Sequence, residues 1–121
     1  MIDREKIRLI LEDEMDSDLL WFGDVPSAIA EENPQLSKAD VRRETLDLVR
    51  DFLQRGIMCI GRYEITGPTQ FCVRRWEMAP DEAVRYIDEA WQADIDRPLR
   101  PGEICEFDRP EDCLPPKDQV D

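Results

Sequence analysis

The chain has 121 residues, of which 29 are acidic, 16 are basic and none is histidine, so its formal charge at neutral pH is -13. The length is that of one domain, and an apolar share of 41% argues against a wholly disordered chain. The absence of histidine excludes Ser–His and Cys–His catalytic dyads and Cys2His2 zinc sites, and the negative charge opposes binding to phosphates. No apolar run is long enough to cross a bilayer and the first residues are not a signal peptide, so we expect a cytoplasmic protein without a membrane partner.

Three helices are expected in the first half of the chain. Residues 3–15 carry apolar side chains at helical spacing on one face and charges on the other, which predicts a surface helix. The apolar run at residues 19–22 indicates a brief strand. Asp24 is expected to cap a short second helix, with Pro26 in its first turn and its end at Asn33.

The third helix has the clearest signals. Ser37 to Asp40 fits a capping box, and Leu36 with Val41 matches a hydrophobic staple. An apolar stripe follows, and Gly56 is placed to end the helix.

The second half is expected to add a hairpin, a helix and one more strand. Strand candidates at residues 57–60 and 71–76 flank a Gly-Pro turn, and Pro80 begins a fourth helix. Residues 103–107 alternate acidic and apolar side chains, which predicts a short edge strand. We therefore expect one domain over residues 1–107 and an irregular, acidic, proline-containing tail over residues 108–121.

The four cysteines have no metal-binding or redox spacing. Cys59, Cys72, Cys105 and Cys113 include no Cys-x-x-Cys pair. We expect reduced thiols, with Cys59 and Cys72 buried as small apolar side chains. Two alternatives stay open: a Cys59–Cys72 bridge across the hairpin, and oxidation at an exposed Cys113.

The order of these elements over residues 3–76 resembles that of winged helix-turn-helix domains. The resemblance implies an α+β fold of three N-terminal helices and a β-hairpin, to which the fourth helix and the short edge strand are additions. It also implies that the third helix is a recognition helix, that residues 64–70 form the wing, and that the domain binds DNA.

The distribution of charge argues against DNA binding without excluding it. Residues 1–36 carry a net charge of -7, residues 37–78 a net charge of +2 and residues 79–121 a net charge of -8. Acidic side chains also interleave with the cations of the third helix at ion-pairing distances. A DNA-binding transcriptional regulator is therefore the alternative function. Its phosphate contacts would be Lys38, Arg42, Arg43, Arg62, Arg74 and Arg75.

Catalysis has no support in the sequence. The paired carboxylates fall on expected helix faces and ends, where solvent explains them, and the serines have no histidine to activate them. The chain has neither the spacing of a calcium loop nor a glycine-rich phosphate loop. We predict no catalytic, metal or cofactor-binding residue, no cofactor, and a protein that is not an enzyme.

A basic protein is the partner that the acidic ends favour. A charge of -13 exceeds the range of about 2–8 that solubility requires of a small domain. Large aromatic residues lie among the carboxylates, an arrangement suited to steering and anchoring a basic surface. The expected contact residues are Asp16, Asp18, Trp21, Glu31, Glu32, Asp88 and Glu89.

The acidic segments at residues 12–18 and 88–91 give the chain a weaker resemblance to the small acidic immunity proteins of bacterial polymorphic-toxin and contact-dependent inhibition systems. This resemblance implies a non-enzymatic antitoxin that binds a basic toxin domain and occludes its active site.

Overall fold

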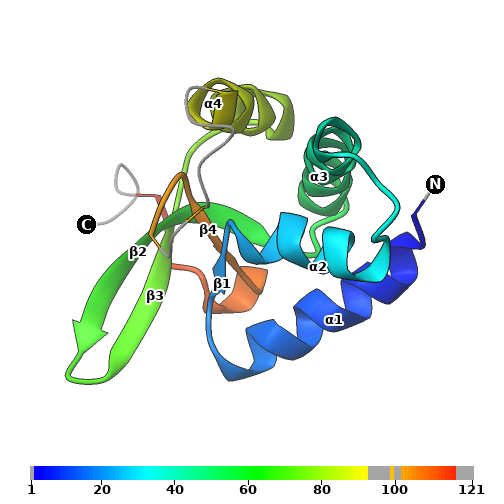
Figure 1. Ribbon diagram of the computed structural model, residues 1–121. Coiled ribbons are helices and arrows are strands. Elements are labelled where there is room, and N and C mark those ends of the chain that lie inside the picture. Colours follow the sequence, from blue (N-terminus) through cyan, green and yellow to red (C-terminus); the bar gives the residue numbers. More distant parts are fainter. Residues whose placement is uncertain (1, 93–98, 100–101, 117–121) are drawn as a thin grey trace.

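The computed structural model describes residues 2–92, 99 and 102–116 (Figure 1). Within these residues the fold is α+β, with four α-helices on one face of a four-stranded antiparallel sheet. In chain order the elements are α1 (Arg4–Ser17), β1 (Leu20–Trp21), α2 (Asp24–Glu32), α3 (Lys38–Gln54), β2 (Cys59–Gly67), β3 (Gln70–Arg75), α4 (Pro80–Gln92), β4 (Glu106–Asp108) and the 3-10 helix η1 (Pro110–Asp112).

Helix starts follow the expected capping in one case and depart from it in another. Ser37 caps α3 as predicted, since its hydroxyl accepts the Asp40 backbone N–H at 3.1 Å. The predicted cap of α2 is wrong, because Gly23 occupies that position and Asp24 is the first helical residue. The Asp24 carboxylate instead accepts the backbone N–H of Trp21 at 3.0 Å, which joins β1 to the start of α2.

The strand order of the sheet is β1-β4-β2-β3, so the predicted edge position of the last strand is wrong. Phe107 of β4 lies opposite Leu20 of β1 on one side and Ile60 of β2 on the other. The alternation of acidic and apolar residues indicated a strand with one solvent-exposed face. However, Glu106 is fully buried, because Arg62 and the backbone N–H of Tyr63 both donate to its carboxylate.

The main core lies between the helices and the inner face of the sheet. Leu20, Ile60 and Phe107 supply its sheet side. The helices contribute Ile7, Leu11, Met15, Val25, Ala28, Ile29, Leu48, Val49, Phe52, Ala83, Val84, Ile87 and Trp91. The outer face of the sheet carries a smaller cluster of Leu19, Cys59 and Val73, which we call the outer cluster.

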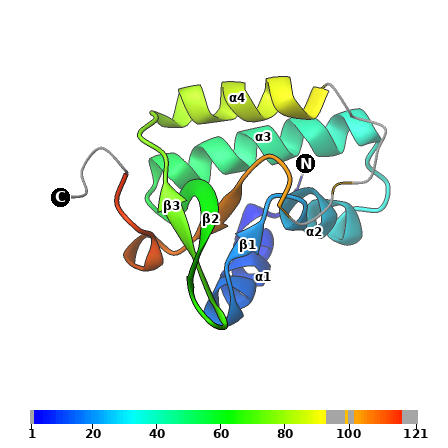
Figure 2. The ribbon, with the colours of Figure 1, turned by 90° about the vertical axis from the view of Figure 1, so that its left-hand side faces the viewer.

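Helix α4 lies alongside α3, and the β2–β3 hairpin projects from the opposite end of the molecule (Figure 2). The hairpin has tightly apposed strands at its base. A side chain on Gly61 would place its Cβ 1.8 Å from the Arg74 carbonyl oxygen of β3. Glycine is therefore required at this position for β3 to pair with β2.

The C-terminal segment is packed against the sheet where an irregular tail was expected from residue 108. Asp108 belongs to β4, and residues 110–112 form η1. Leu114 then makes a parallel bridge to β3: its N–H donates to the Val73 carbonyl at 2.8 Å, and its carbonyl accepts the Arg75 N–H at 3.0 Å. We call residues 109–116 the C-terminal strap. Residues 117–121 of the expected tail lie outside the described residues.

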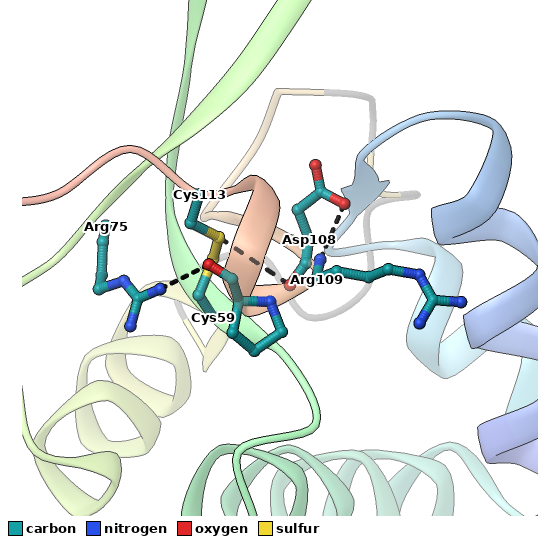
Figure 3. Close-up of a disulfide and its surroundings, with 6 residues drawn as sticks. Cys59, Arg75, Asp108, Arg109 and Cys113 are labelled. Atoms are coloured by element: carbon teal, nitrogen blue, oxygen red, sulfur yellow. Dashed lines mark hydrogen bonds between the residues drawn. A yellow bond between two sulfur atoms is a disulfide. The ribbon is translucent and has the colours of Figure 1, made fainter.

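A disulfide joins Cys59 of β2 to Cys113 of the strap (Figure 3). The prediction that all four thiols are reduced is therefore wrong, and so is the alternative Cys59–Cys72 bridge, since Cys72 is a free thiol. The two bridged residues are 54 positions apart, which leaves no local pattern in the sequence to reveal the pairing. Cys105 is free and buried, whereas Cys72, which was expected to be buried, is partly exposed.

Candidate functional site

Exposed apolar side chains form a row along the outer face of the hairpin. Tyr63 and Ile65 of β2 point to this face, and Ile65 lies opposite Phe71 of β3. The exposed fractions of Tyr63, Ile65 and Phe71 are 36%, 72% and 42%. The Tyr63 ring meets that of Phe71 edge-to-face at 5.6 Å and that of Trp21 of β1 at 5.4 Å. We call Trp21, Tyr63, Ile65 and Phe71 the apolar row.

Sequence reasoning found Trp21 but missed the other three members of the row. The signal is present as alternation with a period of two, since Tyr63 and Ile65 on one strand match Phe71 and Val73 on the other. Only Val73 of these four is buried, because it packs with Leu19 and Cys59 in the outer cluster, whereas the other three lie outside that cluster. An exposed, continuous row of this kind marks an interaction surface more often than isolated apolar residues do.

One group of carboxylates gathers where α1, β1 and α2 meet, beside Trp21. Burial raises the pKa of Glu14, and the nearby charges of Asp24 and Glu31 raise it further. Burial also raises the pKa of Asp24, although the N–H that it accepts from Trp21 opposes this shift. The structure thus places the predicted contact Glu31 in a group with Glu14 and Asp24, which were not among the expected contact residues.

A second group of carboxylates lies at the end of α1 and the base of the strap. Burial raises the pKa of Asp108 to about 6, and the charges of Asp112 and Asp18 contribute to the shift. Asp18 ends α1, and its carboxylate accepts the Leu19 backbone N–H at 2.7 Å. The predicted contact Asp18 is exposed, and it lies near the buried Asp108.

The remaining predicted contacts are dispersed or already paired. Asp16 is exposed and accepts a bond from Arg109 of the strap, while Glu32 pairs with Lys6 at 2.7 Å. Asp88 and Glu89 belong to α4, which Figures 1 and 2 place far from the end of α1. The predicted contacts at the end of α1 and those on α4 therefore do not form one surface.

Two of the three candidate DNA contacts on α3, Arg42 and Arg43, are engaged within the protein. Arg42 is ion-paired with Asp88, and its guanidinium lies 5.7 Å from the centre of the Trp91 ring. Arg43 is exposed but pairs with Asp40 at 2.7 Å. Lys38, also an exposed residue, lies in the first turn of α3.

The candidate contacts on the hairpin also have partners. Arg74 makes two bonds of 3.0 Å to the Glu64 carboxylate across the strand pair. Arg75 donates to the Pro110 carbonyl at 2.8 Å. Arg62 donates to the buried Glu106 at 3.3 Å and to a backbone carbonyl at 2.6 Å.

Neither a metal centre nor a membrane-spanning helix is found among residues 2–92, 99 and 102–116. No three Cys, Asp or Glu side chains in this part of the chain are arranged to hold a metal ion. No helix in it is both long and apolar enough to cross a bilayer. A cavity of about 590 Å³ lies between the strap and the connection from β3 to α4, with Trp76, Met78 and Pro116 in its lining.

No known protein family, curated protein or solved structure matches this chain. The apolar row and the two neighbouring groups of carboxylates are therefore the features from which function is inferred.

Proposed function

We propose that this protein is a non-enzymatic inhibitor that binds a basic protein through the apolar row, in the manner of a bacterial immunity protein or antitoxin. The observation that carries the proposal is the row itself. Three neighbouring side chains are presented to solvent on a hairpin that projects from the body (Figure 2), and the row begins at the partly buried Trp21 of β1, beside a group of carboxylates. A projecting hairpin of this kind is suited to entering the cleft of a partner.

The charge of the molecule supports a basic partner. A net charge of -13 accelerates the approach of a positively charged protein, and carboxylates next to the row fix its orientation. Aromatic side chains at the centre of an interface then supply most of the binding energy. In this proposal Asp18 and Asp24 steer the partner, and Tyr63 and Phe71 anchor it.

A winged-helix-like architecture is part of the proposal. The order α1, β1, α2, α3, β2, β3 supports it, with α4 and β4 as additions. The position of β4 between β1 and the hairpin departs from a simple three-stranded wing sheet. In this architecture α3 would be the recognition helix, yet α4 packs along it and Asp88 engages Arg42. These contacts favour protein binding over the DNA-binding alternative.

A partner identified through the row tests the proposal. A photo-crosslinking residue is placed at position 65 in one variant and at position 9 in another, because Leu9 is a matched exposed apolar residue on α1. The first candidate is the product of the neighbouring gene. We expect crosslinking from position 65 alone, to a protein of basic charge whose activity the wild-type chain blocks.

Point variants then measure the contribution of the row. We expect Ile65→Asp to weaken binding to that partner by at least about 30-fold, as for a hot-spot residue, and Leu9→Asp to have little effect. Asp18→Lys is expected to slow association and flatten its salt dependence. Equal affinities for the two aspartate variants would contradict the proposal. So would retardation of duplex DNA at about 50 mM salt that Arg43→Ala abolishes.

A further inference from the structure

The C-terminal strap is held on the outer face of the sheet by one covalent bond and a short stretch of backbone pairing. The covalent bond is the Cys59–Cys113 disulfide (Figure 3), and the pairing is the bridge that Leu114 makes to β3. Arg75 adds a bond to the Pro110 carbonyl, and Arg74 adds one to the Pro115 carbonyl at 3.0 Å. Arg109 adds bonds to the Asp16 carboxylate and to the Glu12 carbonyl. Beyond these polar contacts, no residue of the strap is fully buried.

The outer cluster lies beneath the disulfide end of the strap. Leu19 and Cys59 are each 5% exposed and Val73 is fully buried. Cys113 of the strap and Trp21 pack against this cluster from the outside. Because Trp21 is also the first member of the apolar row, the outer cluster continues the row beneath the strap.

Like charges oppose the closed position of the strap. Asp112 belongs to the strap, and its carboxylate acts on that of Asp108, which Asp18 also approaches. Arg109 offsets part of this repulsion through its bond to Asp16. The disulfide therefore holds the strap against carboxylates that favour its release.

We infer that the strap is a redox-controlled cover, and that reduction of Cys59–Cys113 by a dithiol lifts it and lengthens the apolar surface offered to a partner. Lifting the strap exposes Leu19 and Val73 beside Trp21. The lifting itself follows from the contacts of the strap, whereas its effect on binding rests on the proposed function.

The reduction is a balanced thiol–disulfide exchange. A thiolate of the dithiol attacks the sulfur of Cys113, the less buried residue of the pair, and the Cys59 thiolate leaves and takes a proton from water. The second thiol of the reductant then displaces Cys113 from the mixed disulfide. Two electrons pass to the protein, and the reductant leaves as its own cyclic disulfide.

Thiol labelling tests whether the strap lifts. The full chain is reduced with dithiothreitol, transferred to buffer without reductant in the absence of oxygen, and treated briefly with N-ethylmaleimide. We expect label at Cys59 and Cys113 and at the partly exposed Cys72, with the fully buried Cys105 protected. Protection of Cys59 equal to that of Cys105 would overturn the inference, because the strap would then stay closed without its disulfide.

Amide hydrogen exchange tests the backbone pairing independently. Reduction and Cys113→Ser are each expected to raise exchange at Leu114 and Arg75 at least tenfold more than at the Ala83 amide of α4, which responds only to the loss of global stability. Cys72→Ser in the oxidised chain is the matched control and should change none of the three. Equal acceleration at Ala83 would show that the disulfide stabilises the whole fold equally. That result would overturn the inference that the strap opens as a separate unit.

The partner experiment separates the two proposals. Once a basic partner is known, we expect the reduced chain to bind it at least tenfold more tightly than the oxidised chain. Equal affinities would overturn the control by the strap and leave the proposed function standing. Label at Cys59 in a chain that has no basic partner would leave the movable strap standing without the proposed function.

Discussion

The guanidinium of Arg42 in α3 is ion-paired with the carboxylate of Asp88 in α4. The sequence assigns these two residues to opposite functions, Arg42 to DNA and Asp88 to a basic protein. In the fold each side chain is the ion-pair partner of the other. The pair joins two helices that lie side by side (Figure 2). An interface between helices accounts for both residues without a ligand of either kind.

This pair is expected to stabilise the protein. The Arg42 side chain is only 19% exposed, so Asp88→Ala leaves a largely buried cation without its acid and should lower the free energy of unfolding by about 1–2 kcal/mol. Asp81→Ala is the control, because Asp81 pairs with Arg50 at 3.0 Å but is 71% exposed. Its cost should be under about 0.5 kcal/mol. Urea unfolding measures both, and similar costs would contradict the assignment.

Gly61→Ala is expected to disrupt the pairing of β2 with β3. The new methyl group would meet the Arg74 carbonyl oxygen, a backbone atom that cannot move without breaking the strand pair. We expect a loss of about 2–4 kcal/mol, as for other severe backbone clashes.

Gly56→Ala is a useful comparison for this substitution. Gly56 has a φ of 70° but nothing within 4 Å of an added Cβ, so its substitution incurs conformational strain alone, about 1 kcal/mol. Thermal unfolding distinguishes the two costs. Equal losses would show that contact with Arg74 is not what limits position 61.

Asp108→Asn is expected to stabilise the protein at neutral pH and not at acidic pH. The pKa of Asp108 is raised to about 6 in the native state, so the folded protein binds this proton more tightly than the unfolded chain does. Ionised Asp108 therefore costs stability, and this cost develops as the pH rises from about 4 to about 6.

The size of the effect follows from the shift. At pH 7.5 the asparagine variant should gain up to about 3 kcal/mol in unfolding free energy, with no gain at pH 3.5. The substitution keeps the oxygen that accepts the Arg109 backbone N–H at 2.8 Å. Asp112→Asn, at an exposed position, should give a smaller gain. Urea unfolding across this pH range provides the measurement, and a gain independent of pH would contradict the raised pKa.

Cys113→Ser is expected to lower the stability of the oxidised protein by about 2–4 kcal/mol, since the disulfide closes a long loop in the unfolded chain. Cys72→Ser removes a thiol without removing a crosslink and should change stability by less than about 1 kcal/mol. After treatment with dithiothreitol, wild type and Cys113→Ser should unfold at similar urea concentrations. A persistent difference in that state would assign the effect to the side chain and not to the crosslink.

Local signals predicted the helices well, because capping and apolar periodicity act over a few residues. Ser37 caps α3 as its sequence pattern indicates, and Pro80 begins α4. Asp24 shows the limit of this reasoning. Its side chain is drawn to the N–H of Trp21, a contact that depends on how β1 approaches α2. A sequence pattern contains no information on that approach.

The candidate surface was harder to predict, because it depends on contacts between distant segments. Trp21 and Tyr63 are 42 positions apart, and their contact exists only after β4 has joined β1 to β2. The sequence pattern predicted that Glu106 belongs to an edge strand. Its carboxylate is buried instead, because Arg62 and the Tyr63 backbone N–H donate hydrogen bonds to it. Cys59 and its partner Cys113 are also far apart in the sequence, by 54 positions, so no local pattern indicated their pairing.

The central position of β4 has a consequence for the order in which the protein folds. Residues 106–108 separate β1 from the hairpin, so everything synthesised before them lacks the strand that unites the sheet. Helices α1 to α4 can form early from local contacts, whereas the sheet must await residues 106–108, which follow all four helices in the chain. During synthesis on the ribosome, the hairpin therefore remains without its inner neighbour until residues 106–108 have been translated. A stop codon shortly before residue 106 would leave β1 and the hairpin as two separated pieces of sheet.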